Sequence, residues 1–157
     1  MSWRLSAAAE RMRKEIDALF PVRDKTSDGA KGDSAHAERV SDHNPDEDGW
    51  VRAIDVDEDV WGRGHQDPAM ANVLCRKIVE IAKKDKRIKY VIFEGHIWSE
   101  SFKWRKRVFQ GYTHPAHIHI SFNKSGDGDG SPFGLVDELR EQVVVARKAV
   151  TKKAVVS

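Results

Sequence analysis

The chain has 157 residues, which is enough for one domain with one hydrophobic core. Hydrophobic residues make up 39% and charged residues 33% of it, a balance typical of globular rather than disordered proteins. Lys and Arg outnumber Asp and Glu by 27 to 25, so the net charge of +2 gives no reason to expect a nucleic-acid partner.

Two amphipathic helices are predicted in the first half of the chain. Apolar residues recur at helical intervals near residues 4–19, and Pro21 ends this pattern. A second helix is predicted near residues 68–84, where Asp67 and Pro68 have the residue types of a cap and a first turn. The only cysteine, Cys75, falls inside this second helix and is expected to be a small buried hydrophobic side chain.

Three strands are predicted near residues 50–57, 88–93 and 117–122. Residues 98–110 are expected to form a hairpin or loop that leads to the last strand. This order of elements predicts an α+β fold, with a small, mainly antiparallel sheet, helices on one face and the functional site on the other.

The predicted domain spans residues 1–125. Residues 126–157 are expected to form a linker and a C-terminal helix, near residues 133–150, with a loose tail. No internal repeat is present.

The last predicted strand carries a row of polar side chains. Alternation along a strand places His117, His119 and Ser121 on one face, while the apolar residues between them face the core. Strands hold ligands more precisely than loops do, so this face is suited to a metal or catalytic site.

An anionic third ligand is available from residues 41–57. His43 precedes a turn rich in Pro, Asp and Gly, and Asp55 lies on the following strand, on the side expected to face the histidines. One Asp and two His form a typical ligand set of catalytic zinc, which keeps a fourth position for a water whose pKa falls to about 7.

These motifs resemble a known superfamily. Ser-x-His at 41–43, Ala-Ile-Asp-Val at 53–56 and His-x-His at 117–119 are similar to the zinc D-Ala-D-Ala carboxypeptidases and L-alanyl-D-glutamate endopeptidases of peptidoglycan. These enzymes share a fold with the hedgehog signalling domain. The resemblance covers about residues 32–122, and the residues around the motifs are most similar to those in proteins of phages and prophages.

The resemblance implies a role for six residues. It implies that Zn²⁺ is bound by His43, Asp55 and His119. It also implies that His117 is a catalytic residue, that His36 is an additional active-site histidine, and that Ser41 contacts substrate. The partner implied is the stem peptide of peptidoglycan.

The chain departs from the superfamily in two respects. The segment between His43 and Asp55 is longer than in these enzymes, and the turn at 44–49 could accommodate the difference as a surface insertion. The carboxypeptidases also have an acidic residue, their general base, at the position occupied here by Ala116.

Several residues could replace the missing base. His117 is chemically suitable because the pKa of histidine lies near neutrality, and it could be paired with His36 or His114. A carboxylate could instead come from another segment, and the candidates are Asp57 and Glu94.

Two further residues are candidates for substrate contact. Trp104 lies within the basic run 103–107, which reads either as a solvated loop with aromatic anchors or as a rim that meets anionic peptidoglycan. His114 precedes Pro115 at the entrance of the last strand, where it could contact substrate or only shape the loop.

Three functions are therefore considered. The first is a zinc peptidase that cleaves the peptidoglycan stem peptide, as a phage endolysin does. The second is a non-enzymatic, zinc-stabilised module that binds a cell wall or a protein, which Ala116 favours. The third is a phosphoesterase that uses His-x-Ser, but its pattern needs two such tripeptides and the chain has one, at 119–121.

The expected location follows from the N-terminus. Residues 1–10 lack the apolar core of a signal peptide, and no apolar run in the chain has the length of a membrane span. We therefore expect a protein that is made in the host cytoplasm, does not insert into the membrane, and acts at the cell wall after release. We also expect it to be a monomer.

Overall fold

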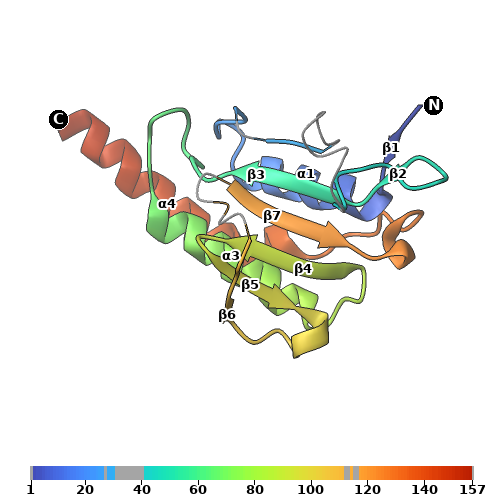
Figure 1. The fold of residues 1–157 in the computed structure, drawn as a ribbon. Coiled ribbons are helices and arrows are strands. Elements are labelled where there is room, and N and C mark those ends of the chain that lie inside the picture. The colour runs from blue at the N-terminus through green and yellow to red at the C-terminus, as the bar shows by residue number, and fades with distance from the viewer. Residues whose placement is uncertain (1, 27, 31–40, 112–113, 115–116, 157) are drawn as a thin grey trace.

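The structure is a computed structural model that describes residues 2–26, 28–30, 41–111, 114 and 117–156. A five-stranded sheet is covered on one face by helices, as Figure 1 shows. The α-helices of the described residues are α1 (Ala7–Leu19), α3 (Pro68–Ala82) and α4 (Leu135–Val156). The sheet strands are β3 (Ala53–Asp57), β4 (Ile88–Phe93), β5 (His96–Ser99), β6 (Arg107–Val108) and β7 (His117–Phe122).

The strand order in this sheet is β3-β7-β4-β5-β6, and each neighbouring pair is antiparallel. The predicted α+β class and mainly antiparallel sheet are thus confirmed. Strands β4 and β7 have the predicted bounds. The segment predicted as a hairpin or loop contains the end of β5, the short 3-10 helix η1 (Glu100–Phe102) and β6, so it includes a hairpin.

The strand predicted at 50–57 is divided into β2 (Trp50–Val51) and β3. Arg52 separates them, because its guanidinium binds Asp46 and Asp127 and its backbone N–H donates to the carbonyl of Asp42. The prediction of one continuous strand was therefore wrong at Arg52.

The first helix begins later than predicted. Arg4 and Leu5 form strand β1, which pairs in parallel with β2, so α1 begins only at Ala7. The backbone N–H groups of Arg4 and Ser6 donate to the carbonyls of Gly49 and Val51. These partners are distant in the sequence, which is why the helical pattern from residue 4 was misleading.

Helix α3 begins as predicted, with the Asp67 carboxylate accepting a hydrogen bond from the Met70 backbone N–H at 3.1 Å. It ends at Ala82 rather than near residue 84. The buried position predicted for Cys75 is confirmed, since it is 1% exposed, and burial raises the pKa of its thiol to about 12.

Helix α4 packs against the same core as the rest of the chain. Its residues Leu135, Leu139 and Val143 belong to the hydrophobic core that also contains Ile54 and Ile118. The helix starts two residues later than predicted and continues to Val156 instead of ending near residue 150, so its end extends past the sheet in Figure 1. Among the described helices, none combines the length and apolar character needed to cross a membrane.

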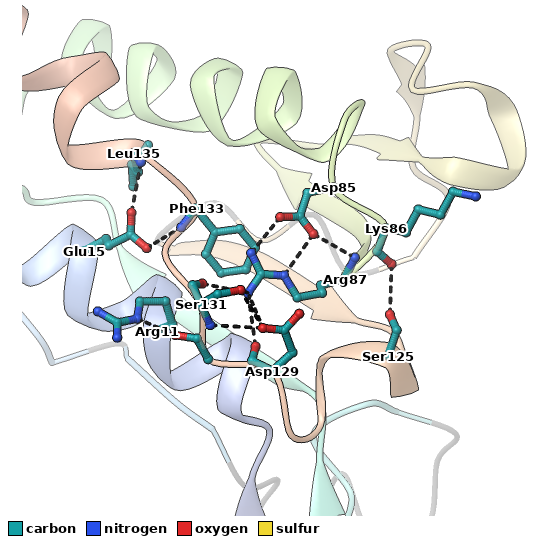
Figure 2. A network of polar contacts seen from close by, with 11 residues as sticks. Arg11, Glu15, Asp85, Lys86, Arg87, Ser125, Asp129, Ser131, Phe133 and Leu135 are labelled. Carbon is teal, nitrogen blue, oxygen red and sulfur yellow. Dashed lines mark hydrogen bonds and ion pairs between the residues drawn. The ribbon is translucent and has the colours of Figure 1, made fainter.

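Polar contacts hold the segment before α4 in place (Figure 2). The buried Glu15 carboxylate accepts hydrogen bonds from the backbone N–H groups of Phe133 and Leu135, at 2.8 and 2.9 Å. Arg87 donates to the carbonyls of Asp129 and Ser131 on the same segment. The start of α4 is therefore anchored to α1 and to the loop before β4.

We expect Glu15→Ala to lower the free energy of unfolding by about 2 to 3 kcal/mol, because it leaves two buried N–H groups without an acceptor. Urea unfolding followed by circular dichroism would measure the loss. Glu10→Ala is the matched control on the same helix, since the ion pair of Glu10 with Lys14 is exposed and its loss should cost about 0.5 kcal/mol or less. Equal effects of the two substitutions would contradict the anchoring role of Glu15.

Candidate metal centre

Three potential ligands from separate parts of the chain meet on the face of the sheet opposite the helices. Strands β3 and β7 pair so that Asp55 lies directly opposite His119. Ile54 and Ile118, which point to the other face, are fully buried in the core, so alternation turns Asp55 and His119 away from it. His43 reaches the same place from the loop that precedes β2.

The three donor atoms form a nearly equilateral triangle. Nε2 of His43 lies 3.3 Å from Oδ1 of Asp55 and 3.1 Å from Nδ1 of His119, and the last two atoms are 3.1 Å apart. A tetrahedral ion bound at about 2.0 to 2.1 Å holds its ligands about 3.3 to 3.4 Å from one another. The group therefore has the donor types and the spacing to hold a metal ion.

The second ring nitrogen of each histidine has its own partner. Nδ1 of His43 donates to the backbone carbonyl of Ala30, and Nε2 of His119 lies 2.8 Å from the hydroxyl oxygen of Ser121. A carbonyl only accepts, so in a neutral His43 the proton is on Nδ1 and the lone pair of Nε2 faces the centre. Such contacts orient metal-binding imidazoles and set which nitrogen binds.

Burial and mutual contacts determine the charges at the centre. Burial alone would raise the pKa of the Asp55 carboxyl, but its contacts with His119 and His43 hold it well below its ordinary value. Burial lowers the pKa of His119, and this outweighs the opposing hydrogen bond to Asp55. Burial lowers the pKa of His43 too, but there the contact with Asp55 outweighs burial and raises the pKa. A metal ion binds the ionised carboxylate and the neutral imidazoles, so it competes with a proton at His43.

Two more histidines adjoin this centre. Nε2 of His117 lies 3.6 Å from Oδ1 of Asp55 and 2.9 Å from Nδ1 of His114. The ring centroids of His114 and His119 are 5.0 Å apart. Burial and the neighbouring imidazoles of His119 and His117 lower the pKa of His114 to about 4. The structure thus brings together four histidines and one aspartate.

The remaining residues proposed from the sequence lie elsewhere or have other contacts. Ser41 accepts a hydrogen bond from the backbone N–H of His43 at 3.2 Å, so it helps to shape the loop that carries this ligand. Trp104 packs against the core in the loop between η1 and β6, toward the opposite edge of the sheet from β3. His36 and Ala116 lie outside the described residues.

The two carboxylates considered as bases also have other surroundings. Asp57 has a carboxylate oxygen within 4.8 Å of those of Asp24 and Asp59, and its Oδ1 accepts from the Asp59 backbone N–H. Glu94 is exposed in the turn between β4 and β5, where its Oε2 lies 3.5 Å from Nδ2 of Asn72. The carboxylate of Asp57 therefore lies with two other carboxylates, and that of Glu94 lies next to an amide.

One residue of the centre was missed by the sequence analysis. The ring of Tyr90 stacks on that of His119 at a centroid distance of 5.4 Å and an interplanar angle of 15°. Burial raises the pKa of the Tyr90 phenol to about 12, although a hydrogen bond with Ser121 opposes this effect. Alternation along β4 assigns Tyr90 to one face of its strand, but the pairing of β4 with β7 is needed to show that this face is the one with His119.

Comparison with known proteins gives no relative for this chain. No family model matches it, and neither a curated protein nor a solved structure is significantly similar to it. The support for a metal centre in the structure is therefore its geometry.

Proposed function

We propose that this protein is a zinc-dependent peptidase that hydrolyses a peptide bond in the stem peptide of peptidoglycan. The observation that carries the proposal is the ligand triangle of His43, Asp55 and His119, with donor separations of 3.1 to 3.3 Å. Two imidazole nitrogens and one carboxylate oxygen in tetrahedral spacing suit zinc better than calcium or magnesium, which prefer oxygen ligands.

The three ligands leave the site with the charge and the access that hydrolysis needs. Two neutral imidazoles and one carboxylate give a zinc site a net charge of +1. When bound, zinc would polarise the carbonyl of the substrate and lower the pKa of a bound water. The side chains of Asp55 and His117 remain 15% and 13% exposed, which favours access to the centre from their side.

His117 is the residue proposed to move the proton. Its Nε2 lies 3.6 Å from a ligand oxygen, close to the donor triangle but outside it. An imidazole at this position can accept a proton from the attacking water and return it to the leaving amine. Tyr90, stacked on His119, limits how far that ring can rotate while this occurs.

The choice of substrate rests on the resemblance described above. The motifs at 41–43, 53–56 and 117–119 are similar to those of peptidoglycan peptidases. The residues around these motifs are similar to those of phage proteins, which favours an endolysin. Such a protein would be made in the host cytoplasm and reach the wall after release, acting as a monomer.

Mass spectrometry of muropeptides after incubation with the zinc-loaded protein tests this proposal. We expect a stem peptide to be cut with addition of one water, and the fragment masses identify the bond. Asp55→Ala should abolish the cut, whereas His65→Ala, which removes an exposed histidine in the loop before α3, should retain it. Intact muropeptides from every wall type, with zinc fully bound, would contradict the proposal.

The alternative function is a zinc-stabilised binding module. Ala116 favours it, because the carboxypeptidases have their acidic base at that position. Sedimentation with purified cell walls separates the two functions: a module remains bound to intact walls, whereas a peptidase releases fragments from them.

A further inference from the structure

A second group of potential ligands lies beside the first and shares one residue with it. Nδ1 of His114 and Nε2 of His117 are 2.9 Å apart, and Nε2 of His117 is 3.6 Å from Oδ1 of Asp55. One donor atom from each of these three residues fits within a span of 4.8 Å. The set again consists of two imidazoles and one carboxylate.

We propose that Asp55, His114 and His117 form a second, weaker binding position for a zinc-like ion, and that an ion bound there inhibits the peptidase. The imidazole donors select borderline transition ions such as Zn²⁺, Co²⁺ or Ni²⁺ over Ca²⁺ and Mg²⁺. The inhibition rests on the proposed function, whereas the binding does not.

Asp55 makes two adjacent positions possible. Its Oδ1 is near His43 and His119 on one side and near His117 on the other, at 3.3, 3.1 and 3.6 Å. A carboxylate can bridge two metal ions through one oxygen or through both. Metal ions in two-metal hydrolase sites lie about 3.5 to 4 Å apart, which is close enough for one carboxylate to contact both.

The backbone supports the second group. His117 is the first residue of β7, so its position is set by pairing with Asp57 on β3. The carbonyl of His114 accepts a hydrogen bond from the Glu94 backbone N–H, which ties it to the β4–β5 turn. The φ angle of His114 is +51°, a conformation that is uncommon for residues other than glycine, although Asn, Asp and His adopt it more often than the rest. The His114 ring lies edge-on to that of His117, with the ring centroids 5.0 Å apart.

The second position should bind more weakly than the first. Its donor separations are less regular, and the carboxylate it uses is already engaged by the first ion. A second dication also experiences repulsion from the first at a distance of a few ångströms, which weakens binding even in a polar environment. We therefore expect sequential rather than simultaneous loading.

Occupation of the second position has a direct consequence for the proposed reaction. The lone pair of His117 Nε2 that accepts the proton is the same lone pair that would bind the second ion. An ion bound there would occupy the nitrogen of His117 that is proposed to accept the proton from the attacking water. Excess metal should then reduce turnover without displacing the first ion.

Titration of the metal-free protein with Zn²⁺ tests the second position without substrate. Calorimetry, with metal analysis after gel filtration at several zinc concentrations, should show a tight first equivalent and a weaker second one. His114→Asn should lose only the second equivalent. Asparagine tolerates the positive φ at this position, so the backbone should be preserved, and the retained tight equivalent is itself the check that the variant folds. His65→Ala is the control and should bind both.

Several outcomes would overturn the proposal. A single equivalent in the wild type, or two unchanged equivalents in His114→Asn, would exclude the second position. His117→Ala should also lose the weaker equivalent and serves as a second variant. In an activity assay, turnover of the wild type should fall as the second equivalent binds, while that of His114→Asn should not fall. A rise in turnover would contradict inhibition, and absence of any turnover would contradict the proposed function while leaving the binding result valid.

Discussion

The protein should hold one tightly bound zinc ion per chain, and Asp55→Ala should remove it almost completely. Asp55 supplies the only negative charge in the triangle, and its Oδ1 is the atom that lies near both His43 and His119. His43→Ala and His119→Ala should each lower occupancy sharply, because two remaining ligands rarely hold zinc against a chelator. Metal analysis after dialysis against a chelator measures the loss.

A graded variant strengthens this test. Ser121→Ala keeps all three ligands but removes the hydroxyl that lies 2.8 Å from Nε2 of His119. Loss of such an orienting partner typically weakens zinc binding about 10- to 100-fold, so its effect should be intermediate. His65→Ala should have none. Full zinc content in all three ligand variants would eliminate the assignment of the centre.

Zinc removal should also lower the melting temperature of the wild type, since an ion that binds only the folded chain stabilises it. The same chelator should leave the melting temperature of Asp55→Ala unchanged.

Local periodicity was sufficient to predict the polar face of β7 and the position of Asp55. Alternation along a strand depends only on neighbouring residues, so it can be predicted without knowledge of the rest of the fold. The register that sets Asp55 opposite His119 could be inferred only from the chemistry of a metal site, and the structure places the two residues in that register.

Other features depend on partners that no local pattern reveals. Strand β1 has two residues and exists because Arg4 and Leu5 pair with Trp50 and Val51, far along the chain. The partner of His43 is the backbone carbonyl of Ala30, which any residue could supply, so no side chain marks it in the sequence. Asp57 has the alternation of a site residue, yet its carboxylate lies with those of Asp24 and Asp59.

The His117→Ala substitution separates a peptidase from a binding module. His117 is 13% exposed at the start of β7, while the apolar residues that hold this strand in the core, Ile118 and Ile120, are untouched. The variant should therefore fold and retain the first, tight zinc ion. Proton transfer by a positioned side chain typically contributes about 10²- to 10⁴-fold in rate, so stem-peptide cleavage should fall by that order while binding to cell walls persists.

The controls for this substitution follow from the geometry of the histidine cluster. His114→Asn removes the contact of 2.9 Å to His117 but leaves the His117 imidazole in place, so at low zinc it should reduce cleavage less than His117→Ala does. Loss of the tight zinc ion in His117→Ala would instead identify His117 as a primary ligand.

Unchanged cleavage would show that another group is the base, and Asp57, Glu94 and His36 would be the residues to replace next. Of these, Glu94 is exposed and has its carboxylate near Asn72, whereas the imidazole of His117 already adjoins the oxygen of Asp55. A peptidase that uses this centre should therefore depend on His117 more strongly than on any other residue outside the ligand triangle.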